Sequence, residues 1–360
     1  MENQPLAERL RPKNLDEYIG QQHFNNLIEL AKEYFGVQPS GVEPLPKSGS
    51  QRRYYRLFVN GKSFIGVYND NLNENQLFIN FTLHFRAKKL HVPQIFAISK
   101  DGLSYIQEDL GRSMLLDFAL NKDNTGGLTE EVMHLYRQAL VELLRFQFLG
   151  GKDLDYSHCL PRPVFDRRSI YWDLNYFKYC FLRLTGLVFD EDALENDFDE
   201  LLNQVCRVPA DFFMFRDFQS RNIMVRDSNI WFIDYQGGRK GALHYDVASL
   251  LYDAVVGIPE KQREELLLYY MSELQHYISI PSSDFLKDYY NFVLIRLLQA
   301  MGAFGLRGLY ERKQHFIDSI LPAINTIYML FDSGRIEHNY PELKRIIFDL
   351  KHTFTLPVLF

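Results

Sequence analysis

The sequence predicts an α+β protein of two lobes, with a small antiparallel β lobe followed by a large, mainly helical lobe. Two observations support this prediction. Short runs of β-branched and aromatic residues, bounded by turn signals, occur within residues 53–107 on both sides of one helical stretch, and such runs are typical of antiparallel strands. From residue 113 onward, apolar residues recur at helical spacing over most of the chain. With 360 residues, of which 46% are hydrophobic, the chain can bury a sizeable core in one large or two modest domains.

The clearest local signal in the first lobe is the dipeptide Asn60-Gly61, which is typical of a two-residue hairpin turn. It predicts that strand 53–59 pairs with strand 63–68. Gly36 is a candidate C-cap for the first predicted helix. The other elements predicted for this lobe are one helix before the hairpin, and one helix and two strands after it, over 24–35, 73–90, 92–97 and 103–107.

The second lobe is predicted to consist of helices around one further hairpin. The segment 237–241, Gly-Gly-Arg-Lys-Gly, is predicted to be a flexible, positively charged loop. The glycines at 302, 305 and 308 indicate close packing or a bend between two helices. The predicted helices cover 115–120, 129–149, 169–184, 192–205, 260–279, 284–306, 309–332 and 340–350, together with one that starts at about His244.

Three polar residues follow one another in a tight series around the second hairpin. Asn222 lies five residues after Asp217 and precedes a short apolar strand, and Asp234 ends the next apolar run. A turn-forming segment, 227–229, separates the two strands. The hairpin is therefore expected to hold an amide oxygen from its entry beside a carboxylate from its exit.

This arrangement is what phosphoryl transfer from ATP requires, since catalysis there is mostly positioning and charge neutralisation. Mg²⁺ takes oxygen ligands, with one or two from protein carboxylates and the others from phosphates and water. Asp234 and Asn222 are predicted to hold Mg²⁺. Asp217 is predicted to accept the proton of the acceptor hydroxyl.

The spacing Arg-Asp-x-x-x-x-Asn, followed by a strand-end Asp, resembles the catalytic loop of protein kinases. The stretch is most similar to the aminoglycoside phosphotransferase and choline kinase superfamily of small-molecule kinases. Phe215, Arg216 and Gln219 occupy the His, Gly and second His places of that loop, and Tyr235-Gln236 follows the metal Asp. Within the superfamily, it resembles the bacterial kinases that phosphorylate cell-wall amino sugars, N-acetylmuramate and N-acetylglucosamine, at the anomeric hydroxyl.

The resemblance implies a two-lobed protein-kinase-like fold, with a nucleotide-binding lobe over 24–110 and a catalytic and acceptor-binding lobe over 111–360. It also implies that Mg-ATP binds in a cleft between the lobes. The predicted phosphate-covering loop contains Ser48, Gly49 and Ser50, because small side chains let backbone N–H groups approach phosphate. The hinge that would pair with adenine is predicted at Gln107, Glu108, Asp109 and Leu110.

The third strand departs from the kinase pattern because it lacks the phosphate-binding Lys at its centre; Lys62 stands at its start. Arg53 is therefore the first candidate for the phosphate anchor and Arg52 the second. Glu74 is interpreted either as the acid that orients this cation or as a first-turn Glu that the helix dipole favours.

Three further acids have predicted roles outside the chemistry. Asp166 and Asp173 lie on a segment that resembles the acceptor-side helix of the amino-sugar kinases. Each is a candidate for binding sugar hydroxyls, or else a helix-capping or solvated acid. Asp246 is expected to give structural support, as an N-cap or first-turn residue. In the superfamily, a matching Asp braces the catalytic loop.

Residues 1–23 closely resemble the opening of AAA-type ATPases of the replication-recombination group, but no phosphate-binding Gly-x-x-x-x-Gly-Lys-Ser/Thr follows. They are interpreted as a leader or peripheral tail of uncertain role.

The charge and cysteine content exclude several other classes of protein. A net charge of −6 gives no reason to expect nucleic acid or an anionic membrane as a partner. The chain lacks an apolar run of 18 residues and a signal-peptide core, so a cytoplasmic location is expected. Three cysteines, at 159, 180 and 206, are predicted to be buried thiols rather than disulfides or zinc ligands.

The sequence therefore predicts an ATP- and Mg²⁺-dependent kinase that phosphorylates a hydroxyl of a sugar or amino sugar. The alternatives are a choline, ethanolamine, homoserine or aminoglycoside kinase, and a catalytically silent nucleotide-binding module. A sugar is favoured over a polycationic aminoglycoside because residues 282–332 carry five acids and five bases, and so no acidic excess.

Overall fold

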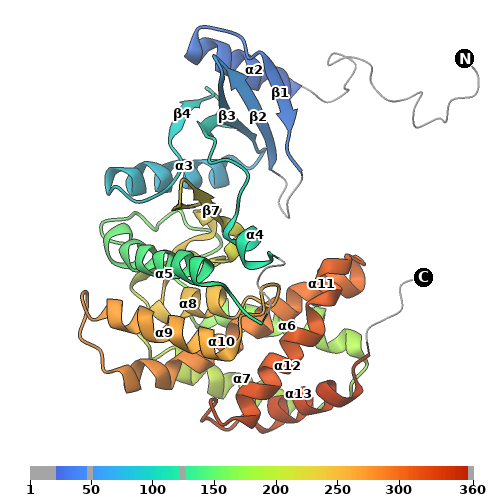
Figure 1. The fold of residues 1–360 in the computed structure, drawn as a ribbon. Coiled ribbons are helices and arrows are strands. Elements are labelled where there is room, and N and C mark those ends of the chain that lie inside the picture. Colours follow the sequence, from blue (N-terminus) through green and yellow to red (C-terminus); the bar gives the residue numbers. More distant parts are fainter. Residues whose placement is uncertain (1–21, 47–51, 122–125, 356–360) are drawn as a thin grey trace, which may run out of the picture. The chain divides into compact units, whose positions relative to one another are not determined.

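The computed structural model describes residues 22–46, 52–121 and 126–355 (Figure 1). They form two compact units. The first comprises the chain up to Leu83 and Pro93–Leu110, and the second comprises His84–Val92 and the chain from Gly111 onward. The predicted division at 110/111 does not anticipate that 84–92 groups with the second unit.

The first unit is built on a five-stranded antiparallel sheet with the strand order β1-β2-β3-β5-β4. The predicted hairpin is present: β2 and β3 pair from Arg53↔Tyr68 to Val59↔Lys62. Asn60 and Gly61 both have positive φ, 51° and 71°, as a type I′ turn requires. The strands are β1 (Gly41–Pro44), β2 (Arg53–Val59), β3 (Lys62–Tyr68), β4 (Ile95–Ile98) and β5 (Ser104–Glu108).

Two helices belong to this part of the chain, α2 (Gln22–Phe35) and α3 (Leu72–Ala87). The helix α2 ends at Gly36, whose φ of 74° is that of a left-handed C-cap. The core of the unit joins α2 to the sheet through Leu30, Ala31, Leu57 and Ile106. The middle strand passes close beneath α2 at Gly66, where an added Cβ would meet Leu27 and Leu57 side-chain atoms at 3.2 Å.

The second unit is mainly helical, as predicted. Its α-helices are α4 (Leu115–Ala119), α5 (Glu130–Arg145), α6 (Arg167–Cys180), α7 (Glu191–Val205), α8 (Leu243–Leu251), α9 (Glu260–Leu274), α10 (Ser282–Phe304), α11 (Gln314–Asp318), α12 (Ile320–Asp332) and α13 (Pro341–Thr353). The single helix predicted over 309–332 is wrong. A π-helical segment, η6 (Gly305–Tyr310), is followed by Arg312 at a φ of 59°, and this left-handed residue separates η6 from α11 and α12.

Two small antiparallel sheets lie among these helices. One pairs β7 (Ile223–Arg226) with β8 (Asn229–Phe232), and the other pairs β6 (Phe212–Met214) with β9 (Arg239–Gly241). The prediction that 237–241 is a flexible charged loop is wrong. Its backbone pairs with β6, and the Arg239 side chain is buried, donating to the carbonyl oxygens of Gly237 and Leu160.

The cysteines are free, and only part of the burial prediction holds. Cys159 is buried and Cys180 is half-buried, but Cys206 is exposed. One stretch of the described chain, Ser282–Tyr310, is long and apolar enough to cross a membrane by length and composition, yet 67% of its most apolar window is buried inside the protein. Core helices of globular proteins share that property.

Helices α6 and α10 pack with their backbones in unusually close contact. A Cβ added at Gly305 would lie 1.9 Å from the carbonyl oxygen of Cys180, and one added at Gly302 would lie 2.6 Å from the ring of Tyr176. Since real Cβ atoms do not approach carbonyl oxygens this closely, only glycine fits at 305.

We expect Gly305→Ala to lower the melting temperature. Gly305 has helical φ and ψ of −63° and −54°, so the better helix propensity of alanine would by itself stabilise the helix by about 1 kcal/mol. The clash with Cys180 outweighs this gain, because overpacking a tight contact costs about 1–3 kcal/mol or more. Thermal unfolding followed by circular dichroism measures the difference.

The matched control is Gly41→Ala, where the nearest atom to an added Cβ is 3.4 Å away on the Phe58 ring. An unchanged or raised melting temperature for Gly305→Ala would contradict this expectation. It would show that the two helices can move apart to admit the Cβ without loss of stability.

Candidate active site

The second predicted hairpin brings its entry and its exit to the same end. Asp227 and Ser228 form the turn with φ of 51° and 59°, and Ile223 faces Phe232 at the open end. The backbone N–H of Ile233 donates to the carbonyl of Asn222 at 3.1 Å. Asn222 and Asp234 therefore flank the open end of one short hairpin.

The three residues predicted to carry the chemistry lie together. The side-chain amide of Asn222 donates to the backbone carbonyl of Asp217 at 2.9 Å, and the same nitrogen lies 3.4 Å from Oδ2 of Asp234. Asp217 is exposed, and the other two are half-buried. One amide thus links the loop that carries Asp217 to the carboxylate at the end of β8.

Buried aromatic rings support the hairpin from beneath. Phe215 lies at the centre of this cluster, with ring centroids 4.9 Å from Phe146, 5.0 Å from Phe218 and 5.8 Å from Phe232. All four rings are at most 2% exposed. Because the loop side chains at 215 and 218 point into this core, the polar residue between them, Asp217, points outward.

The buried carboxylate of Asp246 holds the backbone of the catalytic loop. Its Oδ2 accepts from the N–H of Phe215 at 2.6 Å, and its Oδ1 accepts from the N–H of Arg216 at 3.1 Å. Burial raises the pKa of Asp246 to about 7, against the lowering effect of these two N–H groups. Asp246 lies in the first turn of α8 and braces another segment, whereas the N-cap position of α8 belongs to Ala242.

Arg216 connects this loop to two helices. Its φ of 79° is left-handed, which is uncommon for a residue with a long side chain. The guanidinium donates to Oδ1 of Asp173 at 2.5 Å and to the hydroxyl of Tyr245, and it stacks over the rings of Phe165 and Tyr245. Burial would lower the pKa of Arg216, but Tyr245, Asp173 and Asp217 together raise it, so the side chain is a permanent cation.

The two acids predicted to bind the acceptor have structural partners. Asp166 is the N-cap of α6: its Oδ1 accepts from the N–H of Ser169 at 3.0 Å, and its carboxylate pairs with Arg162. Asp173 pairs with Arg216, while its second oxygen, Oδ2, is buried without a hydrogen-bond partner. Binding of a sugar by either residue stays a prediction.

One residue of the site was not among those predicted from the sequence. The side-chain amide of Gln236 donates to Oδ1 of Asp234 at 2.6 Å. The only sequence signal is its position, two residues after an acid that ends a strand, and a Gln there has no role in the kinase pattern.

The donor chemistry at the end of the hairpin suits Mg²⁺. Asn222 uses its nitrogen in both contacts described above, which leaves its amide oxygen to accept, and Asp234 supplies a carboxylate; both are hard oxygen ligands. The described residues contain no cluster of three or more His, Cys, Asp or Glu side chains able to hold a metal. A metal ion bound here would draw its other ligands from phosphates and water.

In the first unit, two neighbouring arginines have different surroundings. Arg52 is buried, with Nη2 3.0 Å from Oε1 of Glu74 on α3, whose other oxygen accepts from Asn69 at 3.0 Å. Arg53 is exposed, and its Nη1 lies 3.0 Å from Nε2 of His23. Glu74 therefore orients a cation, and that cation is Arg52. Lys62 is exposed at the first position of β3.

The predicted adenine-binding hinge forms the end of β5 and the residues after it. Glu108 accepts from the N–H of Gln94 at 3.2 Å, and Asp109 forms an ion pair with Arg56 at 2.6 Å. Gln107 and Leu110 are buried. The predicted phosphate-covering residues Ser48, Gly49 and Ser50 lie outside the described residues.

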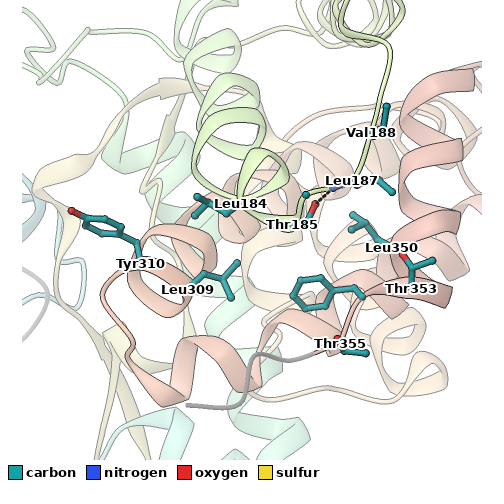
Figure 2. A pocket seen from close by; sticks show the side chains of 11 residues that line it. Leu184, Thr185, Leu187, Val188, Leu309, Tyr310, Leu350, Thr353 and Thr355 are labelled. Carbon is teal, nitrogen blue, oxygen red and sulfur yellow. Dashed lines mark hydrogen bonds between the residues drawn. The ribbon is translucent and has the colours of Figure 1, made fainter. Parts of the chain in front are cut away.

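A hollow of about 750 Å³ in the second unit contains none of the predicted site residues (Figure 2). Its walls are mostly apolar side chains from the segment after α6, from η6 and from the end of α13, among them Leu184, Leu187, Leu309 and Leu350. It offers no acid, base or amide side chain to a substrate, so it is not a candidate for the catalytic centre.

Comparison with known proteins places the chain in a family. Residues 41–277 match the phosphotransferase enzyme family, APH. The N-acetylmuramate/N-acetylglucosamine kinase of Pseudomonas aeruginosa is 26% identical over 283 residues, which are 76% of this chain and 79% of that protein. The enzyme of the same name from Pseudomonas putida is 27% identical over 246 residues, or 67% and 68% of the two chains.

The fold is also that of solved kinases. The ethanolamine kinase of Plasmodium vivax superposes with a TM-score of 0.59 at 12% identity, covering 93% of this chain and 98% of that one. The predicted two-lobed protein-kinase-like fold and the resemblance to amino-sugar kinases are both confirmed. Because the family match spans well over half of the sequence, this chain belongs to the phosphotransferase enzyme family.

Proposed function

We propose that this protein transfers the γ-phosphoryl group of ATP to a hydroxyl group of an amino sugar or hexose in the cytoplasm. The observation that supports this most strongly is the single amide of Asn222, which links the Asp217 loop to Asp234 at one end of the catalytic hairpin. The names of the two bacterial relatives favour an amino sugar among the possible acceptors.

In this proposal, Asp217 orients the acceptor hydroxyl and accepts its proton. The bond between the γ-phosphorus and the β,γ-bridging oxygen breaks, a bond from phosphorus to the sugar oxygen forms, and ADP leaves. Asn222 and Asp234 would hold Mg²⁺, and the bound ion would supply positive charge that neutralises the phosphates. Asp217 is suited to its role because it is exposed while its neighbours Phe215 and Phe218 are fixed in the core.

The phosphate anchor is proposed to be Arg52 in place of Arg53. A buried cation needs a partner, and Arg52 has one in Glu74, which holds the guanidinium in one orientation. Its Nη2 pairs with Glu74, whereas its Nε is buried and makes no hydrogen bond within the described chain. This arginine–glutamate pair would then do what the lysine–glutamate pair does in protein kinases.

The acceptor can be identified by a coupled ADP-release screen over free sugars, choline, ethanolamine, homoserine and aminoglycosides. We expect turnover with N-acetylated or neutral hexoses and none with kanamycin-type drugs, since the C-terminal helices that build the acceptor side carry no acidic excess. Efficient phosphorylation of an aminoglycoside, with none of any sugar, would overturn the choice. No ADP release with any acceptor, by a folded protein that binds nucleotide, would favour the catalytically silent module.

Asp217→Asn tests the proposed proton acceptor. The substitution keeps the shape of the side chain but removes its basicity, so turnover should fall about 10²- to 10⁴-fold, the usual contribution of general-base catalysis. Binding of ATP should change little. Steady-state kinetics on the best sugar provide the measurement.

Asp227→Asn is the matched control, because Asp227 is an exposed acid in the turn of the same hairpin. Turnover by Asp217→Asn that equals the turnover of this control would remove Asp217 from the mechanism.

Substitution of the adjacent arginines tests the phosphate anchor. We expect Arg52→Met to raise the KM for ATP about 10- to 100-fold, the equivalent of one lost charge-assisted hydrogen bond. Arg53→Met should have little effect, and Arg52→Lys should restore part of the affinity. Circular dichroism confirms that each variant is folded. If Arg53→Met has the larger effect on KM, the anchor is Arg53.

A further inference from the structure

We propose that Gln236 is a positioning residue for Asp234: its side-chain amide fixes the orientation in which that carboxylate meets the metal ion. The proposal rests on the proposed function, in which Asp234 and Asn222 hold Mg²⁺. It assigns a purpose to the residue pair that follows the strand-end acid, where this chain has Tyr235 and Gln236.

The two oxygens of Asp234 have different neighbours. Oδ1 accepts a 2.6 Å hydrogen bond from Nε2 of Gln236, whereas Oδ2 lies 3.4 Å from the amide nitrogen of Asn222. A carboxylate that accepts a short hydrogen bond on one of its oxygens cannot rotate freely about its terminal torsion. The bond therefore holds Oδ2 on the side of Asn222, the other residue proposed to hold the metal.

The backbone fixes the distance between the two side chains. Asp234 has left-handed φ and ψ of 63° and 33° and begins the 3₁₀ turn η5 (Tyr235–Gly237). Between Asp234 and Gln236, the ring of Tyr235 is fully buried, with its centroid 5.5 Å from that of Phe85. Because Tyr235 cannot move without opening the core, the residues on either side of it are held at a constant separation.

The turn is closed tightly on its far side as well. The N–H of Gly238 donates to the carbonyl of Tyr235 at 2.9 Å, and a Cβ at Gly238 would lie 2.5 Å from the ring of Phe213. Because the backbone of this turn is rigid, the Gln236 amide cannot shift with the Asp234 carboxylate and can fix its orientation.

The amide of Gln236 makes no competing hydrogen bond within the described chain. Its oxygen, Oε1, is buried without a partner. A buried acceptor left without a donor costs free energy, and a 180° rotation of the amide would place this oxygen against the carboxylate. The hydrogen bond from Nε2 to Asp234 therefore determines the orientation of the Gln236 amide. Hydrogen bonds to metal-binding carboxylates typically change metal affinity about 10- to 100-fold.

The alternative is that Oε1 of Gln236 is itself a metal ligand, and Gln236→Glu separates the two readings. This substitution keeps an oxygen at the same reach but loses the N–H donor and adds a negative charge beside Asp234. If Gln236 is a direct ligand, a carboxylate oxygen replaces its amide oxygen, and the variant should bind the metal more tightly. If Gln236 only positions Asp234, the orienting hydrogen bond is lost and the new charge repels Asp234, so the variant should bind the metal more weakly.

The experiment is a titration of the full-length protein with Mn²⁺, a paramagnetic substitute for Mg²⁺, in the presence of ADP and followed by electron paramagnetic resonance. We expect Gln236→Leu and Gln236→Glu each to weaken Mn²⁺ binding about 10- to 100-fold. The melting temperature measured without metal should stay close to that of the wild type. If Gln236→Leu does not fold, Gln236→Asn, which keeps an amide but shortens its reach, makes the same test.

The matched control is Gln204→Leu. Gln204 on α7 also donates its Nε2 to a carboxylate, Glu200 at 2.5 Å, and also has a buried Oε1 without a partner. Its substitution should leave Mn²⁺ binding unchanged.

Unchanged binding in Gln236→Leu, or tighter binding in Gln236→Glu, would overturn the positioning role. These outcomes differ from failure of the proposed function. If the wild type binds Mn²⁺ and ADP but phosphorylates no sugar, the acceptor assignment falls and the role of Gln236 stands. If the wild type binds no metal in the presence of ADP, both proposals are wrong.

Discussion

The geometry of the catalytic loop depends on one buried carboxylate. Asp246 is fully buried, and its two oxygens accept the backbone N–H groups of Phe215 and Arg216. These two N–H groups would otherwise be buried donors without acceptors, and each such donor costs about 1–3 kcal/mol. The loop therefore takes the path that points both N–H groups at α8, and this path includes the left-handed backbone of Arg216. Along this path the rings of Phe215 and Phe218 point into the core, and Asp217 between them is exposed.

A second constraint is packing. Phe215 and Phe218 bury their rings on one side of the loop, while Arg216 and Asp217 lie between them. The Arg216 side chain then extends to Asp173 and Tyr245, so α6 and α8 both bear on the residue next to the proposed proton acceptor. Aromatic packing, a buried acid and a buried cation thus fix the same four residues from three directions, as expected where position determines rate.

The sequence predicted the parts of this site that are local. Asn222 and Asp234 flank the open end of one hairpin with a two-residue turn, and Asp217 lies five residues before Asn222, so their spacing alone brings them together. Asn60-Gly61 fixed the first hairpin in the same way, since both residues tolerate positive φ. The resemblance to small-molecule kinases rested mainly on the residues around the second hairpin, and it correctly indicated the fold.

The parts that depend on non-local contacts were predicted poorly. Neighbouring residues at the edge of a strand point to opposite sides, so an uncertainty of one residue decides whether Arg52 or Arg53 meets Glu74. The strand β9 has no apolar pattern; its pairing with β6 uses backbone groups, and the burial of Arg239 follows from that pairing. For Gln236, the bond to Asp234 depends on a turn that periodicity does not reveal.

The composition of β3 has a practical consequence for chemical biology. At the centre of this strand, Ile65, Gly66 and Val67 offer no primary amine, and Gly66 instead lets the side chain of Leu27 pack against the sheet. Protein kinases carry a phosphate-binding lysine at that position. A nucleotide analogue that acylates such a lysine would therefore find no target amine in the middle of β3 in this chain.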